Sequence, residues 1–369
     1  MGDELDKPIL SKNPIDGKSK MFRFGINTVQ GWKKTMEVFN IKENNISSED
    51  KNLNIFGIFE GHSGNEISQY LSLNFTSDLL KNENFINNNY KQALIDTFKN
   101  IDISLRTEEI NNKLKFFSHQ NNLEQKQKIE KLYKKIDNKN KDENDLDDIN
   151  NFMEIIDPQN LEGTFISDFV GSSGLVILID EKTTYVANAG NSHFIILNKN
   201  YSIINDKNFI EQNVYNNNEK KRIKISQGIK YGKEKEKLFK NEEYLYTRGF
   251  GNFQYKNNNL ISEEEQEIIA IPDFFEIENK DIKLLIICNS GFFQSGVNLN
   301  NNSNNYIYKY SLNKYIERNI SSYFVQKIQN EPKIISDIIG DYFEEFISHE
   351  NKNNNFNNFS CTIIDFFDN

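Results

Sequence analysis

The sequence contains only two cysteines, Cys288 and Cys361, among its 369 residues. Each lies in a short apolar run of the kind that forms a buried strand, where a free thiol usually only packs. So few thiols exclude a disulfide-rich secreted scaffold. We therefore expect a reducing intracellular compartment, cytoplasmic or nuclear.

Long hydrophobic runs are also missing. The longest, Leu284 to Cys288, is far shorter than the roughly 20 apolar residues that cross a bilayer. The stretch from Met1 to Pro14 is charged and has no apolar centre typical of a secretory signal. We expect no transmembrane segment. Gly2 is a candidate for N-terminal lipidation, but Asp6 stands where the myristoylation pattern has Ser or Thr.

Positive charge is not in excess: Lys and Arg number 44 against 54 Asp and Glu, a formal net charge of -10. This balance argues against a nucleic-acid-binding surface spread over the protein. Asparagine, by contrast, is abundant and clustered, most densely in the loop Asn298 to Asn305. Such polar clusters cannot bury apolar area and are typical of surface loops.

Short runs rich in Ile, Val and Phe predict β-strands, because they are only four to six residues long. They are Asn54 to Phe59, Leu175 to Ile179, Thr184 to Ala189, Phe194 to Leu197, Leu284 to Cys288 and Thr362 to Phe367. Segments with helical spacing of apolar residues are Glu66 to Leu80, Lys91 to Leu105, Lys314 to Gln329 and Lys333 to Ser348. Strands cluster in the middle of the chain, which indicates an α+β layered fold with hairpins.

The domain organisation follows from composition. We expect an N-terminal tail over residues 1–20 and a single domain over residues 21–369. Between about residues 107 and 163 the composition shifts to Lys, Glu, Asp and Asn, which indicates an insertion. Ile129, Leu132, Tyr133 and Ile136 follow helical spacing there. This amphipathic helix either closes a surface loop or binds a partner.

Four groups of short motifs run through nearly the whole chain in order. They are Gln30 to Val38 (Q-G-W-K-K-T-M-E-V); Phe59 to Gly64 (F-E-G-H-S-G); Gly171 to Gly174 (G-S-S-G) with Tyr185 to Ser192 (Y-V-A-N-A-G-N-S); and Thr247 to Phe253 (T-R-G-F-G-N-F) with Cys288 to Gly291 (C-N-S-G) and Asn357 to Ser360 (N-N-F-S). Any one of these tetrapeptides is a weak signal, but the ordered set is specific.

The set resembles the signatures of the metal-dependent protein serine/threonine phosphatases of type 2C. Their motifs read Q-G-x-R-x-x-M-E-D, D-G-H-G-G, G-S-T-A with A-N-x-G-D-S, S-R-A-x-G-D-F, C-D-G and D-N-M-T. The resemblance implies a four-layer αββα sandwich, a central β-sandwich flanked by helices, with a dinuclear Mg²⁺ or Mn²⁺ centre. Such metals generate a hydroxide nucleophile and offset phosphoryl charge, so their ligands are hard, anionic oxygens.

This chain departs from the family pattern at nearly every carboxylate position. The candidate metal-site residues are Glu37, Glu60 and Gly61, and of the carboxylates Glu37 alone is unchanged. Glu60 replaces the bridging aspartate and is still anionic, but its side chain is longer by one carbon. The remaining former ligand positions are neutral: Val38, Asn191, Asn252, Asn289 and Asn357. Asparagine keeps the shape of aspartate but removes its charge.

Charge arithmetic favours loss of the metal centre. Two divalent cations bring four positive charges, whereas Glu37 and Glu60 offer two negative ones, and poorly screened like charges repel by several kcal/mol. We expect no tightly bound cofactor, and Mg or Mn if any binds.

Two catalytic positions persist by resemblance. His62 matches the family histidine that protonates the leaving oxygen, a general-acid role suited to imidazole. Lys33 stands where the family has a phosphate-gripping arginine, and it keeps the charge but loses the bidentate fork. Together they would form at most a weak anion site.

The sequence therefore predicts a pseudophosphatase, a catalytically impaired regulator that binds a protein partner, with a phosphoprotein as one candidate. Two alternatives stay open. One is an active Mg/Mn-dependent serine/threonine phosphatase with weakened metal binding. The other is a structural scaffold that binds through the insertion helix.

Overall fold

The computed structural model describes residues 4–48, 51–121, 165–204, 212–214, 216–231, 246–295, 306–346 and 358–368. The predicted helix around Ile129 to Ile136, the asparagine-rich loop at residues 298–305 and Asn357 lie outside the described residues.

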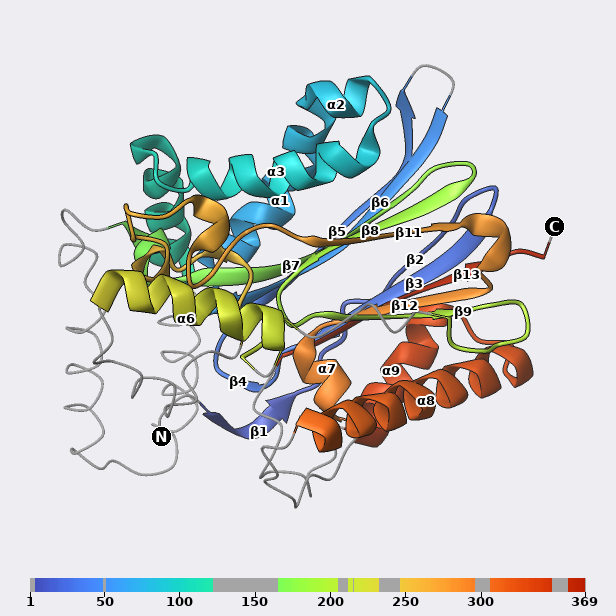
Figure 1. Ribbon diagram of the computed structural model, residues 1–369. Coiled ribbons are helices and arrows are strands. Elements are labelled where there is room, and N and C mark those ends of the chain that lie inside the picture. Colours follow the sequence, from blue (N-terminus) through green and yellow to red (C-terminus); the bar gives the residue numbers. More distant parts are fainter. Residues whose placement is uncertain are drawn as a thin grey trace, which may run out of the picture.

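Two antiparallel sheets form the centre of the molecule (Figure 1). One has the order β11-β8-β7-β6-β5, with β10 paired to β7. Its strands are β5 (Val38–Ser48), β6 (Lys51–His62), β7 (Gly171–Ile179), β8 (Thr183–Ala189), β10 (Phe250–Gly251) and β11 (Asp273–Glu278). The other has the order β2-β3-β13-β12-β9. Its strands are β2 (Ile15–Lys18), β3 (Phe22–Val29), β9 (His193–Leu197), β12 (Leu284–Cys288) and β13 (Phe359–Phe366).

Apolar side chains fill the space between the two sheets. Phe24 of β3, Phe56 of β6 and Ile287 of β12 are fully buried members of this cluster. Because successive side chains of a strand point to opposite faces, a strand buried on both faces reads as a continuous apolar run. Strands β7, β12 and β13 are of this kind, with every residue buried.

Helices cover the outer face of each sheet (Figure 1). Helices α1 (Glu66–Lys81), α2 (Glu83–Ile86) and α3 (Tyr90–Ser104) pack on the β5–β8 sheet. Helices α7 (Ser290–Ser295), α8 (Tyr306–Asn330) and α9 (Ile335–Phe346) pack on the other. In α9 the buried residues Ile335, Ile338, Ile339, Tyr342 and Phe343 lie on one helical face. The four-layer αββα sandwich expected from the resemblance is therefore confirmed.

The N-terminal stretch differs from the expected tail. Strand β1 (Glu4–Ile9) pairs with the short strand β4 (Gly31–Lys33), and β2 pairs along β3 at the edge of its sheet. The polar sequence of β2, with three of its four residues exposed, suits a sheet edge and gives no apolar run. Residues within the first 20 thus belong to the folded unit.

The start of the expected insertion also contributes to the fold. Residues 108–121 are helical, and Ile110 and Leu114 belong to the same core cluster as α1 and α3.

The remaining described elements include four 3₁₀ segments: η2 (Ile166–Asp168), η4 (Phe253–Tyr255), η5 (Glu263–Glu265) and η6 (Asn279–Asp281). Helix α6 (Asn217–Tyr231) packs against η5.

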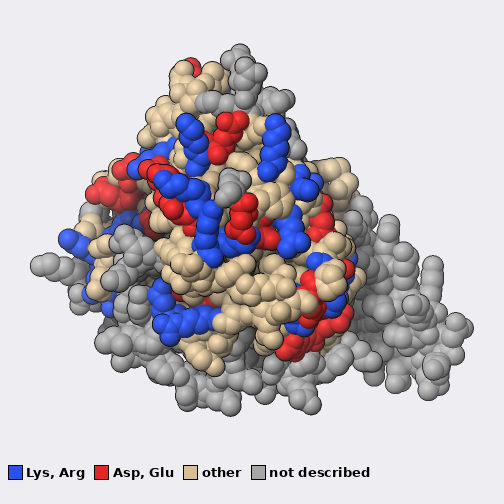
Figure 2. Space-filling view, turned by 90° about the vertical axis from the view of Figure 1, so that its right-hand side faces the viewer, with Lys and Arg blue, Asp and Glu red and all other residues tan. Residues whose placement is uncertain are grey.

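Figure 2 shows one end of the molecule, where Lys and Arg side chains are interspersed with Asp and Glu. Among the described residues drawn there, neither the positive nor the negative side chains form a continuous patch. Across the described residues, no helix combines the length and the apolar character needed to traverse a bilayer.

Candidate functional site: a carboxylate cluster between the sheets

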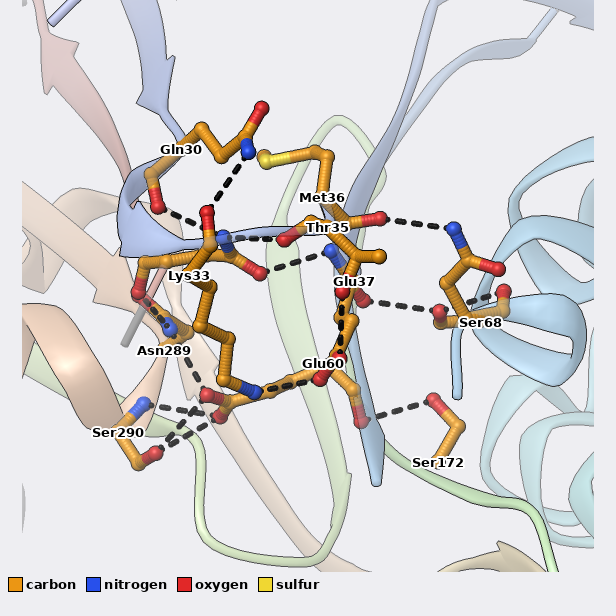
Figure 3. A network of polar contacts seen from close by, with 12 residues as sticks. Gln30, Lys33, Thr35, Met36, Glu37, Glu60, Ser68, Ser172, Asn289 and Ser290 are labelled. Carbon is orange, nitrogen blue, oxygen red and sulfur yellow. Dashed lines mark hydrogen bonds and ion pairs between the residues drawn. The ribbon is translucent and has the colours of Figure 1, made fainter. Parts of the chain in front are cut away.

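Some of the predicted metal-site residues, among them Glu37, Glu60 and Asn289, lie together where strands of both sheets end (Figure 3). Val38 at the start of β5 lies directly opposite Glu60 near the end of β6, so both side chains point to the same sheet face. Val38 packs in the inter-sheet core, 3% exposed. Asn289 follows β12 of the other sheet and reaches Glu60 across the gap.

The Glu60 carboxylate is buried and fully hydrogen-bonded. Asn289 Nδ2 donates to Oε1 at 3.0 Å, and the Ser290 backbone N–H donates to Oε2 at 3.2 Å. The Ser290 hydroxyl lies 3.0 Å from Oε1 and 2.9 Å from Oε2. Burial raises the pKa of the Glu60 carboxyl, and the hydrogen bonds from Ser290 and Asn289, with the charge of Lys33, oppose that rise.

Glu37 is satisfied separately, by its own loop. Lys33 Nζ donates to Oε2 at 2.5 Å and the Thr35 hydroxyl donates to Oε1 at 2.9 Å. Lys33, expected to grip phosphate, therefore points inward to a carboxylate. All four oxygens of the two carboxylates accept internal hydrogen bonds.

Asn358, which precedes β13, holds the first motif in place. Its Nδ2 donates to the carbonyl oxygens of Gln30 and Thr35, at 2.7 and 3.0 Å, and its Oδ1 accepts from Glu37 N at 2.7 Å. The sequence comparison singled out Asn357 instead. The signal was present, because the family motif D-N-M-T has an asparagine at the position of Asn358.

His62 lies at the end of β6, two residues after Glu60. Its ring stacks on Tyr246, with centroids 4.2 Å apart, and its Nε2 is buried without a hydrogen-bond partner among the described residues. Burial, reinforced by the charge of Lys33, lowers the pKa of His62 to about 3. The imidazole is neutral near pH 7 and has no acidic proton of the imidazolium kind to donate.

Asn252 joins this second group rather than the carboxylates. Its φ of 54° is left-handed, and its Nδ2 donates to the Tyr246 hydroxyl. Of the other predicted positions, Gly61 donates its N–H to Glu37 O at 2.8 Å. Asn191 lies just beyond β8, where its buried Oδ1 accepts no hydrogen bond from any described residue.

Comparisons with known proteins support the family resemblance. The sequence profile described as Protein phosphatase 2C matches residues 22–116 and 108–296. "Probable protein phosphatase 2C 2" of Paramecium tetraurelia is 30% identical over 297 residues, covering 79% of this chain and 80% of that protein. "Protein phosphatase 2C 1" of the same organism is 29% identical over 295 residues, covering 79% of this chain and 80% of that one.

The chain belongs to the protein phosphatase 2C family. Its fold is similar to the solved serine-threonine phosphatase 2C from Toxoplasma gondii, with a TM-score of 0.59, 12% identity and coverage of 97% of this chain and 99% of that one. A phosphatase from a pathogenic strain of the same organism gives a TM-score of 0.58 at 13% identity, covering 97% and 96%.

The donor set does not fit the dinuclear centre that the protein phosphatase 2C motifs imply. The two carboxylates already accept hydrogen bonds from Lys33, Thr35, Asn289 and Ser290. The Asn289 side chain presents its N–H donors to Glu60, whereas a cation at this position would need oxygen lone pairs. Within the described residues, no three His, Cys, Asp or Glu side chains gather as a metal group.

Ser290 is the part of this protein phosphatase 2C site that the sequence reasoning missed. It stands at the glycine of C-D-G, and its hydroxyl and N–H make three contacts with Glu60. The substitution was visible in the sequence, but only the structure shows which carboxylate Ser290 contacts.

Proposed function

We propose that this chain is a pseudophosphatase, a protein phosphatase 2C fold that serves as a regulatory, protein-binding module. The observation that carries the proposal is the hydrogen bonding of the four carboxylate oxygens of Glu37 and Glu60 by the protein's own groups. A cation entering the site would have to break these bonds.

The Asn289 amide supports the same proposal. Its two N–H groups go to Glu60 Oε1 and to the carbonyl of Asn358, while its Oδ1 accepts from Ser360 N at 2.9 Å. An aspartate there would place a second buried charge against Glu60 and leave the Asn358 carbonyl unpaired, unless a cation lay between them. The amide thus replaces the cation as the link between the two sheets.

The test is to rebuild the family motif at the two donors. We expect Asn289→Asp with Ser290→Gly to bind Mn²⁺ in calorimetry, because the change adds an anionic ligand and removes the side-chain donors to both Glu60 oxygens, leaving only the backbone N–H of residue 290 on Oε2. The wild-type protein should show no such binding. Asn252→Asp is the matched control: it is the same substitution at another motif asparagine, but beside Tyr246, and it should leave Mn²⁺ binding unchanged.

Activity separates the proposal from a weakened enzyme. We expect wild-type protein at millimolar Mn²⁺ or Mg²⁺ to release no phosphate from a phosphothreonine peptide above the blank. Turnover by the wild type that disappears in Glu60→Gln would overturn the proposal in favour of an active phosphatase. Failure of the rebuilt variant to bind Mn²⁺ would show that Asn289 and Glu60 are not a converted metal site.

A further inference from the structure

The two cysteines of the chain lie opposite each other on neighbouring strands. Cys288, the last residue of β12, is the register partner of Cys361 in β13. Both thiols are free and fully buried, and both belong to the cluster that β12 and β13 share with helices α7, α8 and α9. Because directly opposite residues of an antiparallel pair point to the same sheet face, the two sulfur atoms lie side by side.

The hydrogen bonding of the two strands shows how close the cysteines are. The Asn289 N–H donates to the Ser360 carbonyl oxygen at 3.2 Å, one step beyond the cysteine pair. Hydrogen-bonded and non-hydrogen-bonded pairs alternate along an antiparallel ladder, so Cys288 and Cys361 form a non-hydrogen-bonded pair, whose Cα atoms are about 4.5 Å apart. A disulfide joins Cα atoms that are about 4.4 to 6.8 Å apart. The two thiols can therefore be joined while both strands stay in the sheet.

Helix α7 separates these thiols from the candidate site. It has six residues, and its Phe292 and Phe293 belong to the same buried cluster as the cysteines. The helix begins at Ser290, whose hydroxyl and backbone N–H bond Glu60 of the other sheet. A helix this short is not stable by itself, so contacts such as these hold it on the sheet. Since buried thiols are inert until solvent reaches them, the bonds of Ser290 to Glu60 protect the pair.

We propose that Cys288 and Cys361 form a reversible disulfide when a hydroperoxide reaches them, and that α7 controls this access through its bonds to Glu60. With hydrogen peroxide, one thiol sulfur attacks a peroxide oxygen, becomes a sulfenic acid and releases water. The second thiol then displaces a second water from the sulfenic sulfur. Two S–H bonds are lost, one S–S bond forms, and the two electrons reduce the peroxide. The inference rests on the bonds of Glu60 and is independent of whether the protein hydrolyses phosphoesters.

The disulfide would act back on the candidate site. Cys288 precedes Asn289, and Cys361 follows Ser360, whose N–H donates to Asn289 Oδ1 at 2.9 Å. Opposite Cβ atoms in a sheet are about 4.5 to 5.5 Å apart, whereas those of a disulfide are about 3.8 Å apart. The strands must therefore approach by roughly 1 Å beside this contact. We expect oxidation to loosen the hold of Asn289 and Ser290 on Glu60.

The first experiment treats the reduced full chain with hydrogen peroxide and then blocks free thiols with iodoacetamide in denaturant. We expect an intact mass lower by two hydrogens, with neither thiol blocked, and full recovery of both thiols with dithiothreitol. Because the chain has two cysteines, Cys288→Ser and Cys361→Ser should each abolish this species. The proposal is overturned if both thiols remain blockable, if one gains oxygen without forming the disulfide, or if the disulfide joins two chains.

The second experiment tests control by α7. We expect Ser290→Ala to form the disulfide at least about tenfold faster than wild type, as the loss of a hydrogen bond to a charged group predicts. Glu219→Gln is the control for a general loss of stability, because Glu219 bonds Arg222 and Arg248 instead, and its rate should stay near that of wild type. Equal acceleration by both substitutions would show that the thiols are exposed by unfolding of the whole molecule, and an unchanged rate in Ser290→Ala would show that Ser290 does not protect them.

Hydrogen exchange tests the effect on the site. We expect backbone amides of α7 to exchange faster in the oxidised protein than in the reduced protein, whereas those of α3, which packs on the other sheet, should not change. Identical exchange of α7 in the two forms would overturn the coupling between the disulfide and the bonds of Glu60.

Discussion

His62 shows how one neighbour changes the chemistry of a side chain. Its motif position matches a general acid, but Tyr246 covers its ring and burial holds the pKa at about 3. Tyr246 in turn accepts a hydrogen bond from Asn252. Tyr246, the residue just before the fourth motif, thus helps to bury the imidazole, a contact that the local sequence Glu60 to Gly64 does not contain.

The buried imidazole predicts a pH dependence of stability. The native pKa lies below the ordinary value of 6.5, so the unfolded chain binds a proton that the native state does not. Its contribution is complete above pH 6.5 and is lost as the pH falls towards 3. Relative to His62→Phe, the wild type should lose about 1.4 kcal/mol per pH unit in that window.

Urea unfolding at several pH values between 7.5 and 4 measures this difference. The same substitution at exposed His119 is the control for replacing a histidine. A wild-type curve parallel to that of His62→Phe would contradict a buried, neutral imidazole.

Helix α6 is tied to the sandwich by one buried carboxylate. Glu219, 1% exposed, pairs with Arg248 Nη2 at 2.7 Å and with Arg222 Nη1 at 2.8 Å, and accepts from the Thr247 hydroxyl at 2.6 Å. Arg248 also reaches Asp273 at the start of β11, at 2.8 Å. The motif arginine therefore joins a helix to the edge of a sheet.

Removing this carboxylate should be costly. We expect Glu219→Gln to lower the free energy of unfolding by about 3 kcal/mol, because it leaves buried arginine charge without its partner. Chemical denaturation measures the loss, and Lys221→Ala at an exposed position of the same helix should change stability by less than about 0.5 kcal/mol. Equal effects of the two substitutions would show that Asp273 alone balances Arg248.

At the scale of the whole molecule, protein groups link the two sheets at the site end. Glu60 of one sheet bonds Asn289 and Ser290 beside the other, and Asn358 bonds the loop of Gln30 to Glu37. These hydrogen bonds join the two sheets at that end of the sandwich.

Folding should consequently be insensitive to divalent cations. A ligand at a hundred times its Kd would stabilise the native state by about 2.7 kcal/mol. Because we expect Mn²⁺ not to bind the wild type, its melting curves in chelator and in millimolar Mn²⁺ should coincide. Asn289→Asp with Ser290→Gly should melt higher with Mn²⁺ than without it. A large upward shift in the wild type, abolished by Glu60→Gln, would reveal a retained high-affinity site.

The sequence by itself determined the family, the layered α+β class and the elements with strong apolar patterns. Strands β12 and β13 and helices α1 and α9 were predicted near their observed bounds. The strands contain consecutive apolar residues and the helices contain apolar residues at helical spacing, and both patterns predict burial. The charge deficit of the carboxylate positions was equally visible, since asparagine at an aspartate position needs no structure to recognise.

Only the tertiary structure decided the strands and contacts that depend on distant partners. Strand β3 was missed because its polar residues are matched by far parts of the chain: Arg23 pairs with Asp365, and Asn27 bonds Ser336 O. Edge strands β5 and β11 mix charged with apolar residues. Likewise, whether Lys33 grips a ligand or Glu37, and which carboxylate Ser290 contacts, follows from how loops of separate strands converge, a distance that no local pattern encodes.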